Sequence, residues 1–227
     1  LEYGQPATPR LQLLPSLKAL TDPELLGTSC AITGGTGALG QLVGLWLVGQ
    51  GAEHLSLLSR SGRPGRGEHW AQLQASQTVL HLTTCDVSGS LVGLDAQPTG
   101  LVHAAGVDMY CSLTDLTQTE QHTVLAPKTD GTSNLQMSLA DALLQHAIVF
   151  SSASALVGLR SGSMYATANS CLDTFAQHQR AAGLPAQSVQ WGAWTEIGMA
   201  AGVESSGYMT GGVTNEIGLN AMGAMLA

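Results

Sequence analysis

The chain has 227 residues, of which 44% are hydrophobic and 11% are charged, so it can bury a substantial core. Its 8 basic and 16 acidic side chains give a formal net charge of -8, which excludes the basic field that a nucleic-acid partner needs. No apolar stretch reaches the roughly 18 to 20 residues of a membrane span. The longest one covers residues 42–48, so no membrane partner is expected.

Strands and helices are predicted to alternate along most of the chain. Residues 1–27 contain four prolines, which predicts a linker or a segment packed along an adjoining structural subdomain. For residues 28–227 we predict one α/β domain, a Rossmann-like doubly wound parallel sheet with helices on both faces. The predicted strands are residues 29–33, 54–59, 78–83, 100–105, 146–152 and 186–191, and the predicted helices are residues 38–50, 118–142 and 163–182.

Two connections are short for a parallel crossover, and no strand follows the last helical pattern. Residues 62–77 and 86–101 leave little room for a helix, which predicts abbreviated helices or omitted residues. A helical pattern opens at Thr214 and continues to the end of the chain. This leaves open that the sheet lacks its last strand here.

The cysteines indicate neither a disulfide framework nor a metal site. Cys30, Cys85, Cys111 and Cys171 form no CxxC pair and have no histidine at the spacing of a zinc site. We therefore expect free thiols in a reducing, cytoplasmic compartment, and no bound metal.

A glycine-rich turn directly follows the first predicted strand. Residues 33–40 read TGGTGALG and are followed by a predicted helix. Glycines let the backbone approach a pyrophosphate, and the helix N-terminus offers it unpaired N–H groups and the positive end of a dipole. A tight turn without a ligand is the alternative. The predicted dinucleotide-binding residues of this turn are Thr33, Gly34, Gly35, Thr36, Gly37, Leu39 and Gly40.

The ends of the second and third predicted strands bear on which nucleotide binds. Ser59 and Arg60 end the second strand, where an NAD site would carry an acid for the ribose 2′-hydroxyl. A guanidinium suits a 2′-phosphate, so NADPH is favoured over NADH, the alternative being a solvated surface arginine. Asp86 and Val87 follow the third strand, where an adenine can rest, and a helix N-cap is the alternative role for Asp86.

The end of the fifth predicted strand brings together groups suited to proton transfer. Ser152 ends that strand, and Tyr165 follows 13 residues later. Asn169 lies four residues beyond Tyr165, which places both side chains on one face of a helix. By themselves a Ser, a Tyr and an Asn at such positions are common.

The order of the motifs identifies a family. The chain contains TGGTGALG, LLSRSG, CDV, HAAGV, PKTDG, FSSASALVG, YATAN, LDTFAQHQRAAGLPA and WGAW in that order. Over residues 28–200 it resembles the catalytic half of the ketoreductase domain of modular polyketide synthases, in the short-chain dehydrogenase/reductase superfamily. Ordinary members of that superfamily carry Lys four residues after the Tyr, whereas this family carries Asn there and Lys 37 residues upstream. Asn169 and Lys128 match that exchange.

The resemblance implies an NADPH-dependent reduction of a β-ketoacyl thioester on an acyl carrier protein, giving a β-hydroxyacyl thioester during polyketide elongation. Tyr165 would be the general acid, and Lys128 would lower its pKa and hold the nicotinamide ribose. Ser152 would donate to the substrate oxygen, and Asn169 would support Lys128 and a relay water. The implied partners are the carrier protein, a structural ketoreductase subdomain and other synthase domains. In HAAGV, Ala104, Ala105 and Gly106 would border the cofactor.

Further predictions concern a histidine, a lid, the configuration of the product and the competing functions. His103 is expected to be structural, and residues 195–213 are predicted to form a mobile lid, with a disordered loop as the alternative and Met199 on the substrate side. Residues 108–110 replace the Leu-Asp-Asp of one stereochemical class, and Val157 replaces the Trp of the other, which leans toward the L-hydroxy product. A free-standing carbonyl reductase and a non-catalytic nucleotide-binding scaffold remain the competing functions.

Overall fold

The computed structural model describes residues 29–89, 98–199, 201 and 212–226. The predicted linker at residues 1–27 and most of the predicted lid at residues 195–213 lie outside the described residues. Within the described residues no helix is long and apolar enough to cross a membrane. Nor do three or more His, Cys, Asp or Glu side chains in these same residues gather as metal ligands would.

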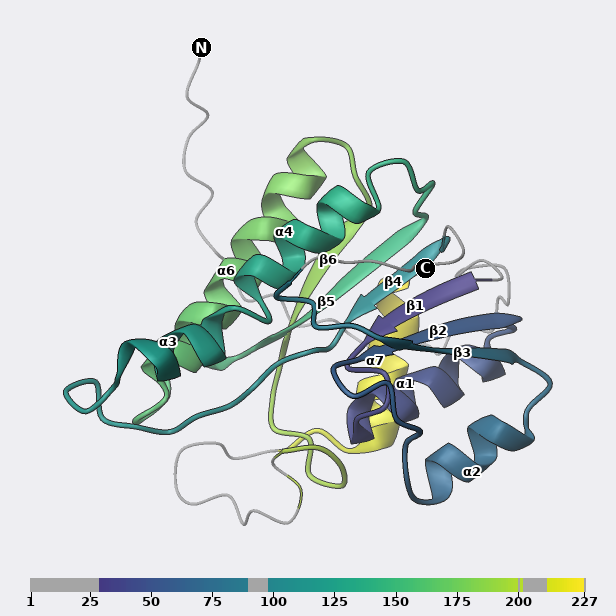
Figure 1. The fold of residues 1–227 in the computed structure, drawn as a ribbon, viewed down its shortest axis with the longest axis horizontal. Coiled ribbons are helices and arrows are strands. Elements are labelled where there is room, and N and C mark those ends of the chain that lie inside the picture. Colours follow the sequence, from purple (N-terminus) through teal and green to yellow (C-terminus); the bar gives the residue numbers. More distant parts are fainter. Residues whose placement is uncertain (1–28, 90–97, 200, 202–211, 227) are drawn as a thin grey trace.

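Six parallel strands form a single sheet in the order β3-β2-β1-β4-β5-β6 (Figure 1). Each of the six predicted strands is present, and four have the predicted bounds. The strands are β1 Ser29–Thr33, β2 His54–Ser59, β3 Val79–Thr84, β4 Gly100–His103, β5 His146–Ser152 and β6 Ala186–Trp191. The chain passes from β1 outward to β3 and then returns to β4, which pairs with β1 on its other side. At such a reversal the connections leave in opposite directions, and open α/β sheets bind ligands there, which here means the carboxyl ends of β1 and β4.

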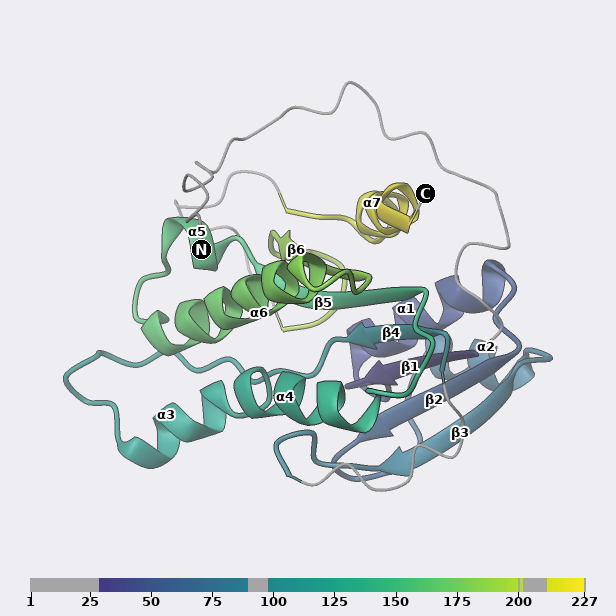
Figure 2. The same ribbon diagram turned by 90° about the horizontal axis from the view of Figure 1, so that it is seen from above.

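Helices cover both faces of the sheet, as predicted (Figure 2). The core on one face includes side chains of α1 (Ala38–Gly49), α2 (Glu68–Ala75) and α7 (Asn215–Leu226). The core on the other face joins α4 (Thr129–Ser138) and α6 (Ser163–Ala181) to the sheet, and α3 (Gln118–Leu125) packs against α6. α2 is one of the abbreviated helices that the short connections predict.

The prediction of one helix over residues 118–142 is wrong, because the structure has α3 and α4 there. α3 begins at a capping box in which Thr117 and Glu120 exchange hydrogen bonds, and it ends at Leu125. Pro127 then interrupts the helix, since proline has no N–H to donate to a helical hydrogen bond, although Ala126 before it keeps a helical conformation. The break positions Lys128 as the residue that precedes α4.

Candidate active site

The glycine-rich turn is packed too tightly for side chains. A Cβ on Gly35 would lie 2.8 Å from the Ile32 carbonyl oxygen, and one on Gly40 would lie 2.3 Å from the Gly34 carbonyl oxygen. Gly34 has a φ of 69°, a conformation that favours glycine. The turn is also held by hydrogen bonds from Gly37 N to Gly34 O and from Gly35 N to Leu58 O. These contacts fix the shape of the turn, and Gly37 and Ala38, where α1 begins, are exposed.

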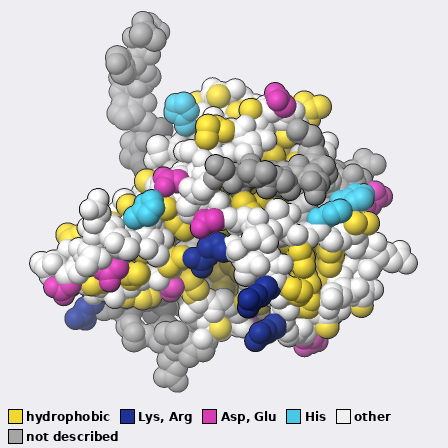
Figure 3. Space-filling model, viewed as in Figure 1, with side chains coloured by type: hydrophobic (Ala, Val, Ile, Leu, Met, Phe, Trp, Pro, Cys, Tyr) yellow, Lys and Arg dark blue, Asp and Glu magenta, His cyan; other side chains and the backbone are white. Residues whose placement is uncertain are grey.

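The N-terminus of α1 is suited to an anion. Its N-cap, Gly37, makes no side-chain capping bond, and its first turn holds no acidic residue. Arg60, Arg63 and Arg66 are exposed in the loop between β2 and α2. Figure 3 shows Lys and Arg side chains gathered on this face of the molecule. A basic loop and an open helix N-terminus thus follow adjacent strands.

The other predicted cofactor residues lie at the same edge of the sheet. Ser59 ends β2, while Asp86 and Val87 follow β3 closely. The Asp86 carboxylate accepts a hydrogen bond from Ser88 N at 3.0 Å in a turn rather than at a helix N-cap. The predicted nucleotide residues therefore come from the carboxyl ends of β1 to β4.

His103 links the glycine-rich turn to β4. It is fully buried, and its Nδ1 lies 2.6 Å from the Thr33 hydroxyl, which accepts a hydrogen bond from Ala105 N at 3.2 Å. Burial first, and then the charge of Lys128, lower the pKa of His103 to about 3. His103 is therefore neutral at physiological pH, which fits the structural role that the sequence predicts.

Lys128 is buried beside this segment. Only 4% of the residue is exposed, and its Nζ donates to the Phe150 carbonyl oxygen at 2.7 Å. A Cβ on Gly106 would lie 2.9 Å from Lys128 Cε, so the small residue in HAAGV makes room for the lysine. The lysine thus contacts both β5 and the segment after β4.

Ser152, Tyr165 and Asn169 come together at the carboxyl end of β5. Tyr165 is hydrogen-bonded by the Ser152 and Asn169 side chains. The Asn169 amide also donates to the Tyr165 carbonyl oxygen at 2.8 Å, whereas Asn169 Oδ1 is buried without a hydrogen-bond partner. Since Ser152 lies two residues beyond Phe150, the structure brings the four predicted catalytic residues to one place.

One electrostatic expectation is wrong. The pKa of Tyr165 is raised rather than lowered, because burial outweighs the hydrogen bonds from Ser152 and Asn169, and Asp108 raises it further. Lys128 lies against the Phe150 carbonyl and does not lower the pKa of Tyr165. A raised pKa keeps the phenol protonated at neutral pH, which is the form that donates a proton.

The surroundings of Tyr165 include side chains that the sequence only partly indicated. Tyr110 is 60% exposed, and its electrostatic coupling to both Tyr165 and Asp108 places it near the site. Val157 and Met199 are also exposed.

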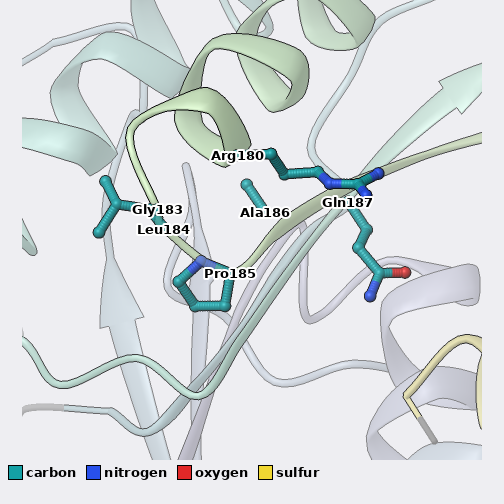
Figure 4. A pocket seen from close by; sticks show the side chains of 6 residues that line it. All are labelled: Arg180, Gly183, Leu184, Pro185, Ala186 and Gln187. Atoms are coloured by element: carbon teal, nitrogen blue, oxygen red, sulfur yellow. The ribbon is translucent and has the colours of Figure 1, made fainter.

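A separate hollow lies away from this site. It has a volume of about 440 Å³ and lies where α6 ends and β6 begins (Figure 4). Its lining residues are Arg180, Gly183, Leu184, Pro185, Ala186 and Gln187. Because the predicted site residues lie at the opposite, carboxyl ends of the strands, this hollow is not part of the candidate site.

The sequence predicted a different role for one residue near Lys128 and did not indicate a second one. Gly106 was predicted only as a cofactor contact, whereas it also borders Lys128. Asp173 lies four residues after Asn169 and eight after Tyr165, so the helical spacing could have shown that all three share a face.

The fold and the site define a short-chain dehydrogenase/reductase, because a doubly wound sheet carries a glycine-rich turn and a Ser–Tyr–Lys–Asn set at one edge. Comparison with known proteins identifies the family. A protein-family model described as "KR domain", for ketoreductase, matches residues 28–196. The chain belongs to the ketoreductase domains of modular polyketide synthases, which are oxidoreductases.

Individual relatives agree. The chain is 39% identical over 195 residues to polyketide synthase GfsB of Streptomyces halstedii, covering 82% of this chain and 4% of that protein. It is 38% identical over 193 residues to the pikromycin synthase component PikAIII of Streptomyces venezuelae, covering 80% of this chain and 12% of that one. A structure of A-type ketoreductases from a modular polyketide synthase matches with a TM-score of 0.81 and 31% identity, over 96% of this chain and 48% of the other. The chain thus spans a small part of these synthases.

Proposed function

We propose that this domain uses NADPH to reduce the β-keto group of an acyl-carrier-protein-bound thioester to a β-hydroxyl group during polyketide elongation. The observation that carries the proposal is the meeting of Ser152, Tyr165, Asn169 and Lys128 at the end of β5. Family membership supports ketoreduction as the reaction.

The residues present fit NADPH. The turn is fixed at Gly35 and Gly40, which have no room for side chains, and α1 begins at the exposed Gly37 without a competing acid. Arg60 is exposed at the end of β2 and would take the 2′-phosphate. When bound, NADPH supplies the hydride that reduces the ketone carbon.

The side chains of the chain then manage the charge on the ketone oxygen. Ser152 donates a hydrogen bond to that oxygen, and the protonated Tyr165 phenol gives it a proton. The Lys128 ammonium stabilises the negative charge that develops nearby and holds the nicotinamide ribose. Asn169, whose Oδ1 has no partner among the described residues, accepts from a water that returns a proton to Tyr165.

The proposed partners follow from the family. The matched relatives are polyketide synthases, of which this chain covers a small fraction, so we assign the domain to a larger synthase with a structural ketoreductase subdomain and other domains. The acyl carrier protein presents the substrate. Neither stereochemical signature of the family is present, at residues 108–110 or at Val157, and the absence of Leu-Asp-Asp leans toward the L-hydroxy product.

The test is NADPH oxidation with a β-ketoacyl thioester, followed by chiral chromatography of the product. We expect turnover with NADPH, weaker turnover with NADH, and the L-hydroxy thioester. Substrate on the carrier protein should react faster than its N-acetylcysteamine thioester. Binding of NADPH without turnover of either substrate would indicate a nucleotide-binding scaffold, and equal activity on small free ketones would indicate a free-standing carbonyl reductase.

A further inference from the structure

Lys128 is a buried charge with few partners in the described structure. Its ammonium has three N–H donors, of which one bond is formed, to the Phe150 carbonyl oxygen at 2.7 Å. Taking an ammonium out of water costs several kcal/mol unless nearby groups compensate. A carboxylate within electrostatic reach would therefore decide how readily this lysine stays charged.

Asp173 is such a carboxylate, and two side chains of β6 hold it in place. Ser188 Oγ donates to Asp173 Oδ1, and Gln190 Nε2 donates to Oδ2 at 2.7 Å. Ser188 and Gln190 flank Val189, whose partner in β5 is Phe150. Because Phe150 is also the acceptor for Lys128, the ammonium contacts β5 next to the part of β6 whose side chains bind the carboxylate.

The charges around Lys128 leave Asp173 as the compensating group. Burial lowers the pKa of Lys128 to about 8, and Asp173 opposes that shift. His103 faces the lysine from β4 and is neutral, while Asp130 on α4 is exposed. Tyr165 shares the α6 face with Asp173 and is protonated, since its pKa is raised.

We propose that Asp173 is a positioning residue whose carboxylate, fixed by Ser188 and Gln190, keeps the buried Lys128 side chain charged. The effect on turnover rests on the proposed function, whereas the effect on the lysine does not. At neutral pH a group with a pKa near 8 is about ten to one in favour of the charged form, so losing the carboxylate would bring the neutral form into the working range.

The chain suits a direct measurement, because Lys18 and Lys128 are its two lysines. With lysine labelled by ¹³C and ¹⁵N, the side chains give two signals, which a Lys18→Arg variant assigns. We expect the titration midpoint of Lys128 to fall by roughly one pH unit in Asp173→Asn and in Asp173→Ser. It should stay near the wild-type midpoint in Asp173→Glu, which keeps the charge.

Two controls separate charge from structure. Asp141→Asn makes the same chemical change on an exposed residue, and Ser188→Ala removes one hydrogen bond to Asp173 but keeps its charge. Both should leave the Lys128 midpoint within a few tenths of a pH unit of wild type. An unchanged midpoint in Asp173→Asn and Asp173→Ser would overturn the proposal, as would an equal fall in Asp141→Asn.

Kinetics give a second readout. If the wild type reduces the thioester, the high-pH limb of its rate profile should move to lower pH in Asp173→Asn and stay in place in Asp141→Asn. A shifted Lys128 titration with no wild-type turnover would retain the inference and reject the proposed function. Wild-type turnover with an unshifted Lys128 titration in Asp173→Asn would retain the proposed function and reject the inference about Asp173.

Discussion

The two sides of the candidate site, at the ends of β1 and β5, differ in the groups that form them. On the β1 side, closely packed glycines fix the turn, since a Cβ on Gly35 or Gly40 would lie within 3 Å of other atoms. On the β5 side, the side chains come from Ser152 at the end of β5, Tyr165 in α6 and Lys128 just before α4. In the proposed function, the first side recognises the cofactor by shape and the second acts by charge and proton transfer.

This difference predicts how substitutions on each side change stability, binding and turnover. The shape of the glycine side is set by short-range repulsion, so substitutions there should lower stability and binding together. The β5 side holds a buried ammonium that costs free energy, so substitutions there should lower turnover without lowering stability. The predictions that follow use this contrast.

The largest effect is expected for Tyr165→Phe. Removing the phenol removes the proton donor, so kcat should fall by about 10²- to 10⁴-fold. NADPH binding, followed by fluorescence titration, should be retained. Tyr110→Phe is the matched control because it removes the hydroxyl of a neighbouring, 60% exposed tyrosine. Equal losses in the two variants would remove Tyr165 as the acid.

Lys128→Met should abolish turnover without lowering stability, and the pH dependence of its stability should differ from that of the wild type. The pKa of Lys128 is about 8 in the folded chain against 10.5 for the free side chain, so between these values the unfolded chain binds more protons. The free energy of unfolding contributed by Lys128 therefore rises with pH across that window, by up to about 3 kcal/mol. Below pH 8 both states are protonated and the full cost of burial is present.

Urea unfolding of the wild type and of Lys128→Met from pH 7 to 11 measures the contribution of Lys128 to the free energy of unfolding. We expect the wild type to gain stability relative to Lys128→Met as the pH rises, and the variant to be at least as stable as wild type at pH 7, where turnover is lost. A constant difference across the pH range would contradict the buried charge.

The third prediction concerns the glycine side. In Gly40→Ala the new methyl group would lie 2.3 Å from the Gly34 carbonyl oxygen, so the turn must shift. We expect a loss of about 1–3 kcal/mol in the free energy of unfolding, with weaker NADPH binding. Gly49→Ala is the control, since its Cβ would meet nothing within 4 Å and alanine favours a helix. Similar melting temperatures for the two variants would contradict the packing argument.

The same contrast explains what the sequence could predict. The glycine side is local, because a strand, the TGGTGALG turn and a helix follow one another directly, and the strand at residues 29–33 has the predicted bounds. The helix break at Pro127 was missed, although proline lacks the N–H of a helical hydrogen bond and so indicates a break. Without that break the position of Lys128 could be predicted only by resemblance to a family.

Electrostatics was the less predictable part of the site. Spacing placed Tyr165 and Asn169 on one face of α6, and the structure has them there. The sign of the pKa shift of Tyr165 depends on how deeply the phenol is buried and on where Lys128 points. Neither follows from residue spacing, because both depend on packing between distant segments.

The smallest effect is expected for Arg60→Ala, which sharpens the contrast by changing recognition alone. Arg60 is exposed at the end of β2, so its loss should leave the fold intact. A charge-assisted bond to the 2′-phosphate contributes about 1.5–3 kcal/mol, so KM for NADPH should rise by at least about tenfold. KM for NADH should not change, because NADH has no 2′-phosphate. Arg63→Ala, in the same loop, is the matched control, and an equal rise for both cofactors would show that Arg60 does not read the phosphate.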